Sequence, residues 1–358
     1  MRLAIALGAR GLGRVWPNPA VGCVIVREGR VLARGWTQPG GRPHAEAIAL
    51  ARCDARGATA YVSLEPCAHH GKTPPCAEAL IGAGVARVVT ALTDPDPRVA
   101  GRGHDMLRAA GIEVAEGVEA EAAARVQAGF LMRIREGRPM VTLKLALTLD
   151  GRIATATGES CWITGPEARR AVHGLRASHD AVLVGAGTAR ADDPDLRVRG
   201  LGVAHQPVRV VASARLNVPP SGRLGASARE APVWLVHAPE APAEAQTAWA
   251  GTGAELIACP DAGERLDMAA MLRALAARGL TRVLCEGGGA LAAALLRADL
   301  TDELVIFAAG KIIGAEGRAG VGPLDLSALA SAPRFELAAL RHVGGDVLQH
   351  WRRLSSPK

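Results

Sequence analysis

Short runs of β-branched and apolar residues alternate along this chain with segments whose apolar residues recur at helical spacing. In the first third, strand-like runs cover residues 21–26, 31–34, 59–64, 87–92 and 112–115, and the first two form a predicted hairpin. Helical patterns cover residues 2–12, 45–56, 104–110 and 120–136, and another helix is expected to begin near residue 76. The alternation predicts an α/β fold with a mostly parallel sheet that helices cover on both faces.

The length of 358 residues predicts two domains, because single cores stop growing near about 250–300 residues. The helical pattern at 120–136 ends at Gly137-Arg138-Pro139, and we therefore expect domains at 1–138 and 139–358. Beyond the boundary, residues 141–146, 181–184 and 282–286 predict buried strands. Hydrophobic residues make up 49% of the chain and aromatic residues only 3%, so the cores must consist mainly of Ala, Val and Leu.

The formal net charge of +7 is mild and scattered, which favours an anionic, phosphorylated small substrate over nucleic acid. No charged-then-apolar leader follows Met1, and no apolar run approaches the ~20 residues that cross a bilayer. The seven cysteines are an odd number, and two of them have a better use as metal ligands. We expect a cytoplasmic homo-oligomer with no nucleic-acid or membrane partner.

One imidazole and two thiols form the strongest chemical pattern in the sequence. His44, Cys67 and Cys76 are ligand types that Zn²⁺ takes, and three protein ligands leave its fourth position for water, as in catalytic sites. Glu46 fits the H-x-E…P-C…C signature of zinc deaminases, in which the carboxylate shuttles protons. Residues two apart in a helix point ~200° apart, so His44 must precede the first turn and Glu46 must lie within it.

The loops around this pattern supply candidate substrate contacts. Asn18 stands between two prolines, which hold it in an extended loop. It is either an ordinary turn residue or a hydrogen-bonding contact to a base-like ring. Eight residues separate the two thiols, and this insertion carries His69, His70 and Lys72. All three are candidate substrate contacts, with Lys72 favoured as an anion contact; each is otherwise a solvated loop residue.

Two glycine-rich turns follow predicted strands in the second half, at residues 185–188 and 287–289. Backbone N–H groups at such turns bind phosphate, although the G-x-G-x-x-G spacing of a doubly wound dinucleotide fold is absent. Lys144 lies within the strand predicted at 141–146 and is either an aid to catalysis or part of a structural ion pair.

The motifs Asn18-Pro19, Pro43-His44-Ala45-Glu46, Leu64-Glu65-Pro66-Cys67 and the segment 71–76 resemble the deaminase half of the bifunctional riboflavin-biosynthesis deaminase/reductase family. Residues from Thr142 onward resemble its reductase half, which is similar in fold to dihydrofolate reductase and uses NADPH. The resemblance implies a cytidine-deaminase-like three-layer domain followed by a dihydrofolate-reductase-like domain.

The resemblance also implies contacts in the second domain. The implied NADP contacts are Ala146, Trp162, Thr188, Asp192, Gly288, Gly289, Ala290, Leu291, Ala292, Ala293 and Ala294. The implied substrate contacts are Ser160, Arg176, Leu196, Arg199 and Glu286, and the two arginines suit a 5′-phosphate clamp. The chain departs from the family at Thr37, where a His is frequent, at Trp16, where a small residue is usual, and at Ala212-Ser213-Ala214, where Leu-Asp-Ser is usual.

We therefore expect a two-domain enzyme with one zinc ion per chain and NADPH as cofactors. The first domain would deaminate 2,5-diamino-6-(5-phosphoribosylamino)pyrimidin-4-one, and the second would reduce the ribosyl side chain to ribityl. The alternatives are a zinc deaminase of another nucleobase or of nucleic acid, joined to an unrelated nucleotide-binding domain, and a non-catalytic structural-zinc scaffold. Glu46 argues against the scaffold, because a structural site has no use for a carboxylate beside an open coordination position.

Overall fold

The computed structural model describes residues 1–70, 74–260 and 265–354. The chain divides into two compact units, Met1–Gly137 and Arg138–Lys358. Within the described residues no helix combines the length and the apolar character needed to cross a bilayer.

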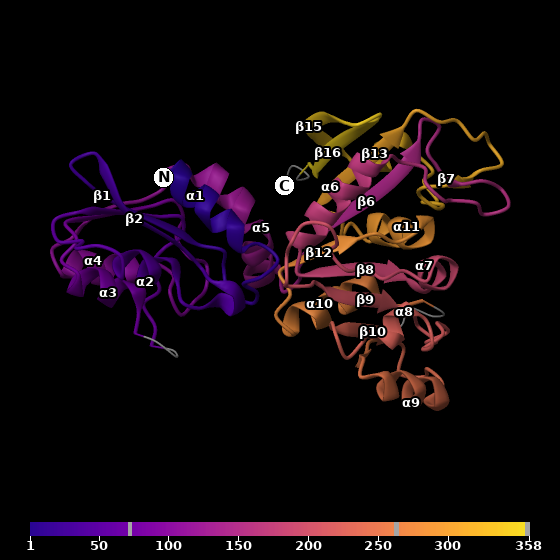
Figure 1. Ribbon diagram of the computed structural model, residues 1–358, viewed down its shortest axis with the longest axis horizontal. Helices are drawn as coiled ribbons and strands as arrows, with labels where there is room; N and C mark the ends of the chain where they lie inside the picture. Colours follow the sequence, from indigo (N-terminus) through magenta and orange to yellow (C-terminus); the bar gives the residue numbers. More distant parts are fainter. Residues whose placement is uncertain (71–73, 261–264, 355–358) are drawn as a thin grey trace. The chain divides into compact units, whose positions relative to one another are not determined.

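The first unit is a five-stranded sheet between helices (Figure 1). Its elements are, in chain order, α1 (Arg2–Gly8), η1 (Ala9–Gly11), β1 (Gly22–Arg27), β2 (Arg30–Trp36), η2 (Pro39–Gly41), α2 (Ala45–Leu50), β3 (Thr59–Val62), α3 (Cys76–Gly82), β4 (Arg87–Thr90), α4 (Arg102–Ala109), β5 (Glu113–Ala115) and α5 (Ala120–Glu136). α2, α3 and α4 lie along one face of the sheet, and α1 and α5 lie along the other (Figure 1). This is the three-layer arrangement expected from the sequence.

Strand direction in this sheet differs from the prediction of a mostly parallel sheet. The strand order is β2-β1-β3-β4-β5, and only the β3–β4 and β4–β5 pairs are parallel. β1 pairs with β2 in the antiparallel sense because the tight turn after Arg27 returns the chain at once. β1 also pairs with β3 in the antiparallel sense, and the chain reaches β3 from β2 by way of α2. The carboxyl ends of β3 and β4 nevertheless meet at one edge, where open α/β sheets hold their sites.

Small and branched side chains fill the space between the sheet and its helices. Cys23 and Ile25 on β1, and Ala60 and Val62 on β3, pack with Leu80 of α3 in one cluster of fully buried residues. Strands alternate their side chains between faces, so Val24 points the other way and packs on α1. The composition rich in Ala and Val thus brings the helices close to the sheet.

The second unit contains a nine-stranded sheet in the order β11-β10-β9-β8-β12-β6-β13-β16-β15. Its elements are β6 (Met140–Thr148), β7 (Arg152–Ala154), α6 (Pro166–Ala177), β8 (Ala181–Gly185), α7 (Ala186–Asp192), β9 (Val208–Ala212), α8 (Arg223–Ala226), β10 (Val233–His237), α9 (Ala243–Thr252), β11 (Glu255–Ala258), α10 (Met268–Ala277), β12 (Arg282–Cys285), α11 (Gly289–Arg297), β13 (Glu303–Ala309), β14 (Arg318–Ala319), η3 (Leu329–Ser331), β15 (Phe335–Val343) and β16 (Asp346–Arg353). β14 pairs with β7 in a separate two-stranded sheet.

The strands in the spatial order β11-β10-β9-β8-β12-β6-β13 all run parallel to one another. β16 pairs with β13 and β15 pairs with β16 in the antiparallel sense, at one edge of the sheet. The predicted central strands read as continuous apolar runs because both of their faces are covered, and β8 is buried over Ala181–Val184. The adjacent pairs β8–β12 and β12–β6 bring the ends of three predicted strands together. The two predicted glycine-rich turns, which follow β8 and β12, therefore lie at the same edge of the sheet.

Candidate active sites

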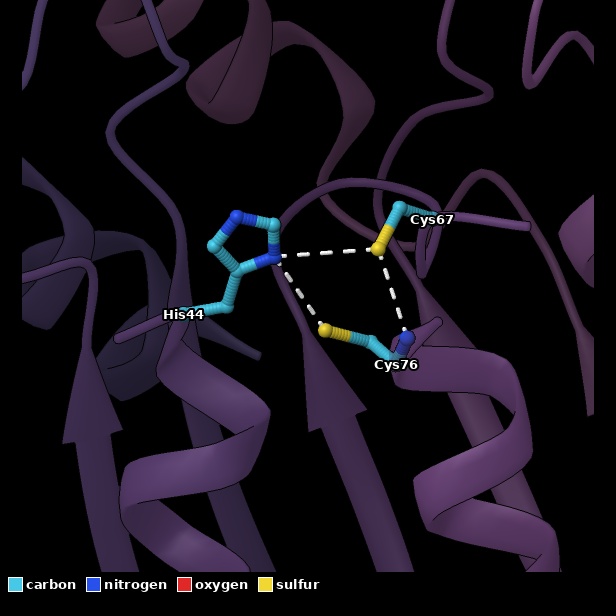
Figure 2. A group of neighbouring side chains, drawn as sticks. All are labelled: His44, Cys67 and Cys76. Carbon is cyan, nitrogen blue, oxygen red and sulfur yellow. Dashed lines mark hydrogen bonds between the residues drawn. The ribbon is translucent and has the colours of Figure 1, made fainter. Parts of the chain in front are cut away.

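Three side chains from separate segments converge at the carboxyl edge of the first sheet. His44 is the N-cap residue of α2, Cys67 follows β3, and Cys76 is the first residue of α3. Nδ1 of His44 lies 3.3 Å from Sγ of Cys76 and 3.7 Å from Sγ of Cys67 (Figure 2). Within the described residues this is the group of three or more His, Cys and acidic side chains that could hold a metal ion, with all ligand atoms within 4.8 Å of one another.

The spacing of these atoms fits zinc. Tetrahedral bonds of about 2.3 Å to sulfur and 2.0 Å to nitrogen separate a nitrogen from a sulfur ligand by about 3.5 Å. The two observed nitrogen–sulfur distances of 3.3 and 3.7 Å lie on either side of that value. The backbone N–H of Cys76 also donates to Sγ of Cys67 over 3.3 Å, which stabilises a thiolate there (Figure 2).

The electrostatics of the cluster favour a cation. The hydrogen bond from the Cys76 thiol lowers the pKa of Cys67 to about 4, and His44 and the Cys76 backbone N–H add to that effect. The pKa of Cys76 is raised because its proton is held by Cys67 and because its thiol is buried. The hydrogen bond to Cys67 also raises the pKa of His44. The cluster therefore stabilises the negative charge of a thiolate at Cys67, among three donors of the kind that zinc prefers.

Glu46 lies where the sequence argument requires it, in the first turn of α2 directly after the N-cap His44. Its carboxyl is buried at 3% exposure and hydrogen-bonds with the Cys76 side chain. Burial raises the pKa of Glu46 to about 7, and the nearby Cys67 thiolate adds to the rise. The α2 helix ends at Leu50 and not near Arg56, as the apolar pattern predicted, so only its first turn serves the site.

The Asn18 loop is anchored next to the His44 segment. A Cβ added at Gly41, which has φ +82°, would lie 1.9 Å from Nδ2 of Asn18, so only glycine permits this contact. Thr37 is buried, and its hydroxyl accepts a hydrogen bond from the backbone N–H of Val21 over 3.1 Å. The Thr37 side chain therefore holds the backbone that directly follows the Asn18 loop.

The loop between the two thiols is only partly described. His69 is half-buried, and its Nδ1 has no hydrogen-bond partner among the described residues. His70 is exposed and lies 3.3 Å from a carboxylate oxygen of Glu78. The predicted anion contact Lys72 lies outside the described residues.

The two glycine-rich turns of the second unit lie together. β8 and β12 are parallel neighbours, and the backbone N–H of Gly288 donates to Oγ1 of Thr188 over 3.0 Å. Gly288 is the N-cap residue of α11, which leaves backbone N–H groups of that helix start without intrahelical partners. Two signals that are weak in isolation thus form one edge suited to binding phosphate groups.

Arg176 and Glu286 form an ion pair beside Lys144. Nε and one terminal nitrogen of Arg176 donate to the two carboxylate oxygens of Glu286, over 2.6 and 3.0 Å, and the other terminal nitrogen donates to the Arg197 carbonyl. Burial lowers the pKa of the Lys144 ammonium, although the Glu286 charge opposes the effect. Burial raises the pKa of Glu286, but Arg176 and Lys144 outweigh it and hold the carboxyl ionised.

The other predicted reductase contacts differ in accessibility. Leu196 is buried at φ +61°, a conformation rare for leucine and frequent at functional sites. Ser160, Trp162, Asp192, Arg199 and Ala290 are exposed, Ala146, Thr188, Gly288, Gly289 and Ala294 are half-buried, and Leu291, Ala292 and Ala293 are buried. Ser213, at the departure from the family's Leu-Asp-Ser, is buried and donates to the side chain of Asn217 over 3.2 Å.

Two basic side chains that the sequence argument missed hold Trp162. Nζ of Lys311 donates to the Trp162 carbonyl over 2.7 Å, and the Arg169 guanidinium lies 4.2 Å from the centre of the indole ring. Trp162 has φ +37°, so these contacts hold a strained backbone. Lys311 is 149 residues away in sequence, and no local pattern connects the two.

Comparison with known proteins shows similarity over both units of the chain. Residues 1–92 match the cytidine and deoxycytidylate deaminase zinc-binding region, and residues 139–349 match the RibD C-terminal domain. The riboflavin biosynthesis protein RibD of Escherichia coli is 42% identical, with 98% of this chain and 97% of that protein covered. The Aquifex aeolicus protein of the same name is 37% identical, with 99% and 97% covered.

Solved structures show the same two-part architecture. Acinetobacter baumannii RibD superposes with a TM-score of 0.89 at 38% identity, covering 99% of this chain and 98% of that one. A diaminohydroxyphosphoribosylaminopyrimidine deaminase/5-amino-6-(5-phosphoribosylamino)uracil reductase from Thermotoga maritima has a TM-score of 0.85 at 36% identity, covering 99% and 97%.

The fold and the site define a zinc-binding deaminase domain followed by a reductase domain. Such a pair within one chain is a bifunctional enzyme, with a hydrolase in its first part and an oxidoreductase in its second. The chain belongs to the riboflavin biosynthesis protein RibD family.

Proposed function

We propose that residues 1–138 deaminate 2,5-diamino-6-(5-phosphoribosylamino)pyrimidin-4-one and that residues 139–358 reduce the ribosyl side chain of the product with NADPH. The observation that carries the proposal is the three-ligand cluster with a buried carboxyl beside it, in a chain whose second half is a reductase domain. The name of the Thermotoga maritima structure, which states both activities, supports the choice of substrates.

In the deaminase, His44, Cys67 and Cys76 would hold the zinc ion and Glu46 would move protons. Zinc bound there would lower the pKa of a water toward ~7. Glu46 accepts a proton from the attacking water, delivers it to the ring nitrogen and protonates the departing ammonia. Its burial suits this role, because an apolar environment keeps the neutral and charged forms of the carboxyl close in energy.

Asn18 and His69 are the proposed substrate contacts of the deaminase, together with Lys72 as the contact to the phosphate. The packing of Asn18 on Gly41 supports a fixed direction for its amide. The unpartnered Nδ1 of His69 supports a role in hydrogen bonding to substrate.

In the reductase, NADPH would supply the hydride that adds to C1′ of the ribosyl group. The Lys144 ammonium donates a proton to the ring oxygen as the C1′–oxygen bond breaks, and the open ribityl chain results. Lys144 is half-buried near Glu286 and Arg176, and a lowered pKa makes its ammonium a better proton donor. Arg176 remains a proposed phosphate contact, although its bonds to Glu286 and Arg197 leave fewer N–H groups for a ligand.

The glycine-rich edge is the proposed NADP site, with Ala146, Trp162, Thr188, Asp192 and residues 288–294 as contacts. The bond between Gly288 and Thr188 supports one continuous phosphate-binding edge. Because Leu291, Ala292 and Ala293 are buried, their contacts would be made by the backbone. Ser160, Leu196, Arg199 and Glu286 are the other proposed substrate contacts.

We further propose a cytoplasmic homo-oligomer. All seven cysteines are free thiols, as in proteins of reducing compartments. Leu337 and Leu340 of β15 are 50% and 61% exposed on the edge strand of the large sheet, a surface that a second copy would cover. Light scattering on Leu337→Glu/Leu340→Glu should show a smaller assembly than the wild-type chain, and an unchanged mass would contradict the use of this surface.

The test of function is to assay both half-reactions on the purified chain. We expect ammonia release from the diaminopyrimidine substrate, and NADPH oxidation when the deaminated product is supplied directly. A chain that oxidises NADPH but releases no ammonia with zinc present would refute the deaminase assignment, and the reverse result would refute the reductase assignment.

A further inference from the structure

A buried carboxylate two residues before the Cys67 ligand binds a second loop of the deaminase. Glu65 follows β3 and is 4% exposed. Its Oε2 accepts the backbone N–H groups of Asp94 and Gly101, each over 3.0 Å, and its Oε1 accepts that of Gly103 over 2.9 Å. Hydrogen bonds to a charged acceptor are the stronger kind, so these three contacts hold the backbone firmly.

The loop that Glu65 holds, residues 94–103, follows β4. β3 and β4 are parallel neighbours, so this loop leaves the sheet at the same edge as the Cys67 segment. The contact is close, because a Cβ added at Gly103 would lie 2.0 Å from the Pro66 carbonyl oxygen. Before Gly103 the backbone is strained, with φ +32° at Ala100, and such a conformation persists only where its surroundings impose it.

The same loop lies near His69, two residues after the Cys67 ligand. Asp96 holds the Arg98 guanidinium with both carboxylate oxygens, and His69 is near enough to contribute to the lowered pKa of Asp96. The backbone N–H of Asp96 donates to Oδ1 of Asp94 over 2.9 Å, so the fold of the loop starts from the residue that Glu65 anchors. Glu65, before Cys67, therefore holds the 94–103 loop, and His69, after Cys67, lies near the same loop.

The geometry points to Glu65 as a positioning residue of the deaminase, which sets the distance between the 94–103 loop and the ligand segment and so the width of the substrate site. This inference rests on the proposed deaminase function. Glu65 acts through the backbone N–H groups it accepts, and a displacement of about 1 Å in a wall of the site is enough to reduce a rate by ~10²-fold.

Glu65→Gln is the test variant, because it keeps the side-chain shape but turns an amide NH₂ toward backbone donors. At least one of the three bonds is lost. Glu113→Gln is the matched control, since Glu113 is on β5 of the same sheet and its side chain is 67% exposed. Gly103→Ala is the second variant, which leaves Glu65 intact but forces the loop away from the Pro66 carbonyl.

Four measurements are made on the full-length chain, at a temperature where circular dichroism shows each variant folded. For Glu65→Gln and Gly103→Ala we expect KM for deamination to rise about tenfold and kcat/KM to fall about 10–100-fold. We expect an unchanged zinc content and unchanged reduction of the deaminated substrate. Amide exchange of peptides covering residues 93–103 should be faster than in Glu113→Gln, also after the zinc has been removed.

Unchanged exchange in Glu65→Gln overturns the inference, because Glu65 then does not hold the loop. Faster exchange with an unchanged KM overturns the positioning role alone. Loss of zinc in proportion to loss of deamination also overturns it, since Glu65 would then act on the metal ligands. If the wild-type chain itself releases no ammonia, the proposed function fails together with this inference. This outcome is distinct from failure of the inference alone, in which the wild type is active.

Discussion

Replacing Glu286 by Gln should destabilise the reductase unit and impair its site at once. The Glu286 and Arg176 side chains are 9% and 12% exposed, and Gln would remove the negative charge that pairs with the Arg176 guanidinium and faces the Lys144 ammonium. Removing one member of a buried ion pair costs 3–5 kcal/mol. Because both side chains keep some contact with solvent, we take the lower end, about 3 kcal/mol of unfolding free energy.

A loss of about 3 kcal/mol lowers the melting temperature of a unit of this size by about 6–12 °C. Thermal unfolding followed by tryptophan fluorescence checks this shift, with Glu240→Gln, at an exposed position, as the control. NADPH oxidation should lose kcat/KM in Glu286→Gln at temperatures where the variant is folded, while ammonia release is unaffected.

A double-mutant cycle with Arg176→Met separates the pair from other effects. If the two side chains act as one charged unit, the double variant should be at least 2 kcal/mol more stable than the sum of the single losses predicts. A coupling below about 0.5 kcal/mol would show that the two residues are independent, and the reasoning from the ion pair would then be wrong.

Three further outcomes are expected. Glu46→Gln should keep its zinc but deaminate about 10³-fold more slowly, since it removes the general acid–base group; elemental analysis with an ammonia assay checks both, and near-normal turnover would exclude Glu46 from the chemistry. Chelation of the zinc should stop ammonia release but not NADPH oxidation on the deaminated substrate, and joint loss in a folded chain would contradict the division of labour. Burial lowers the pKa of His179 from 6.5 to about 4. Between pH 6.5 and 4 the imidazole is therefore protonated in the unfolded chain but neutral in the folded chain. The unfolding free energy should therefore fall by about 3 kcal/mol from this group as the pH drops from 6.5 to 4, as urea titrations can measure. In His179→Gln the fall should be smaller by that amount, and an equal fall would refute the assignment.

The sequence predicted the zinc cluster well because its ligands stand at element boundaries that local chemistry marks. Prolines precede His44 and Cys76, and a strand pattern precedes Cys67. The placement of His44 at the N-cap and Glu46 in the first turn was confirmed, because helix geometry alone excludes other arrangements of two inward-facing residues at that spacing. The helix 120–136 was also predicted with its observed limits.

The predicted hairpin of β1 and β2 was confirmed, but the antiparallel pairing of β1 with β3 and the true end of α2 were predicted less well. Apolar patterns do not reveal strand direction, and helix ends depend on which turn still has a surface to pack against. The role of Thr37 depended on the Val21 backbone, which local pattern does not place beside it.

By itself, the sequence determined which residues can bind a divalent ion, where strands and helices fall, and that two cores are needed. These properties depend on side-chain chemistry and on short-range spacing, which the chain carries in one dimension. Only the tertiary structure decided that Glu65 accepts hydrogen bonds from a loop some thirty residues further along the chain. It also decided that Lys311 donates to the Trp162 carbonyl and that Thr188 connects the two glycine-rich turns. Contacts of this kind arise when separate segments meet in a packed fold, and their free energy depends on burial and distances that no local pattern encodes.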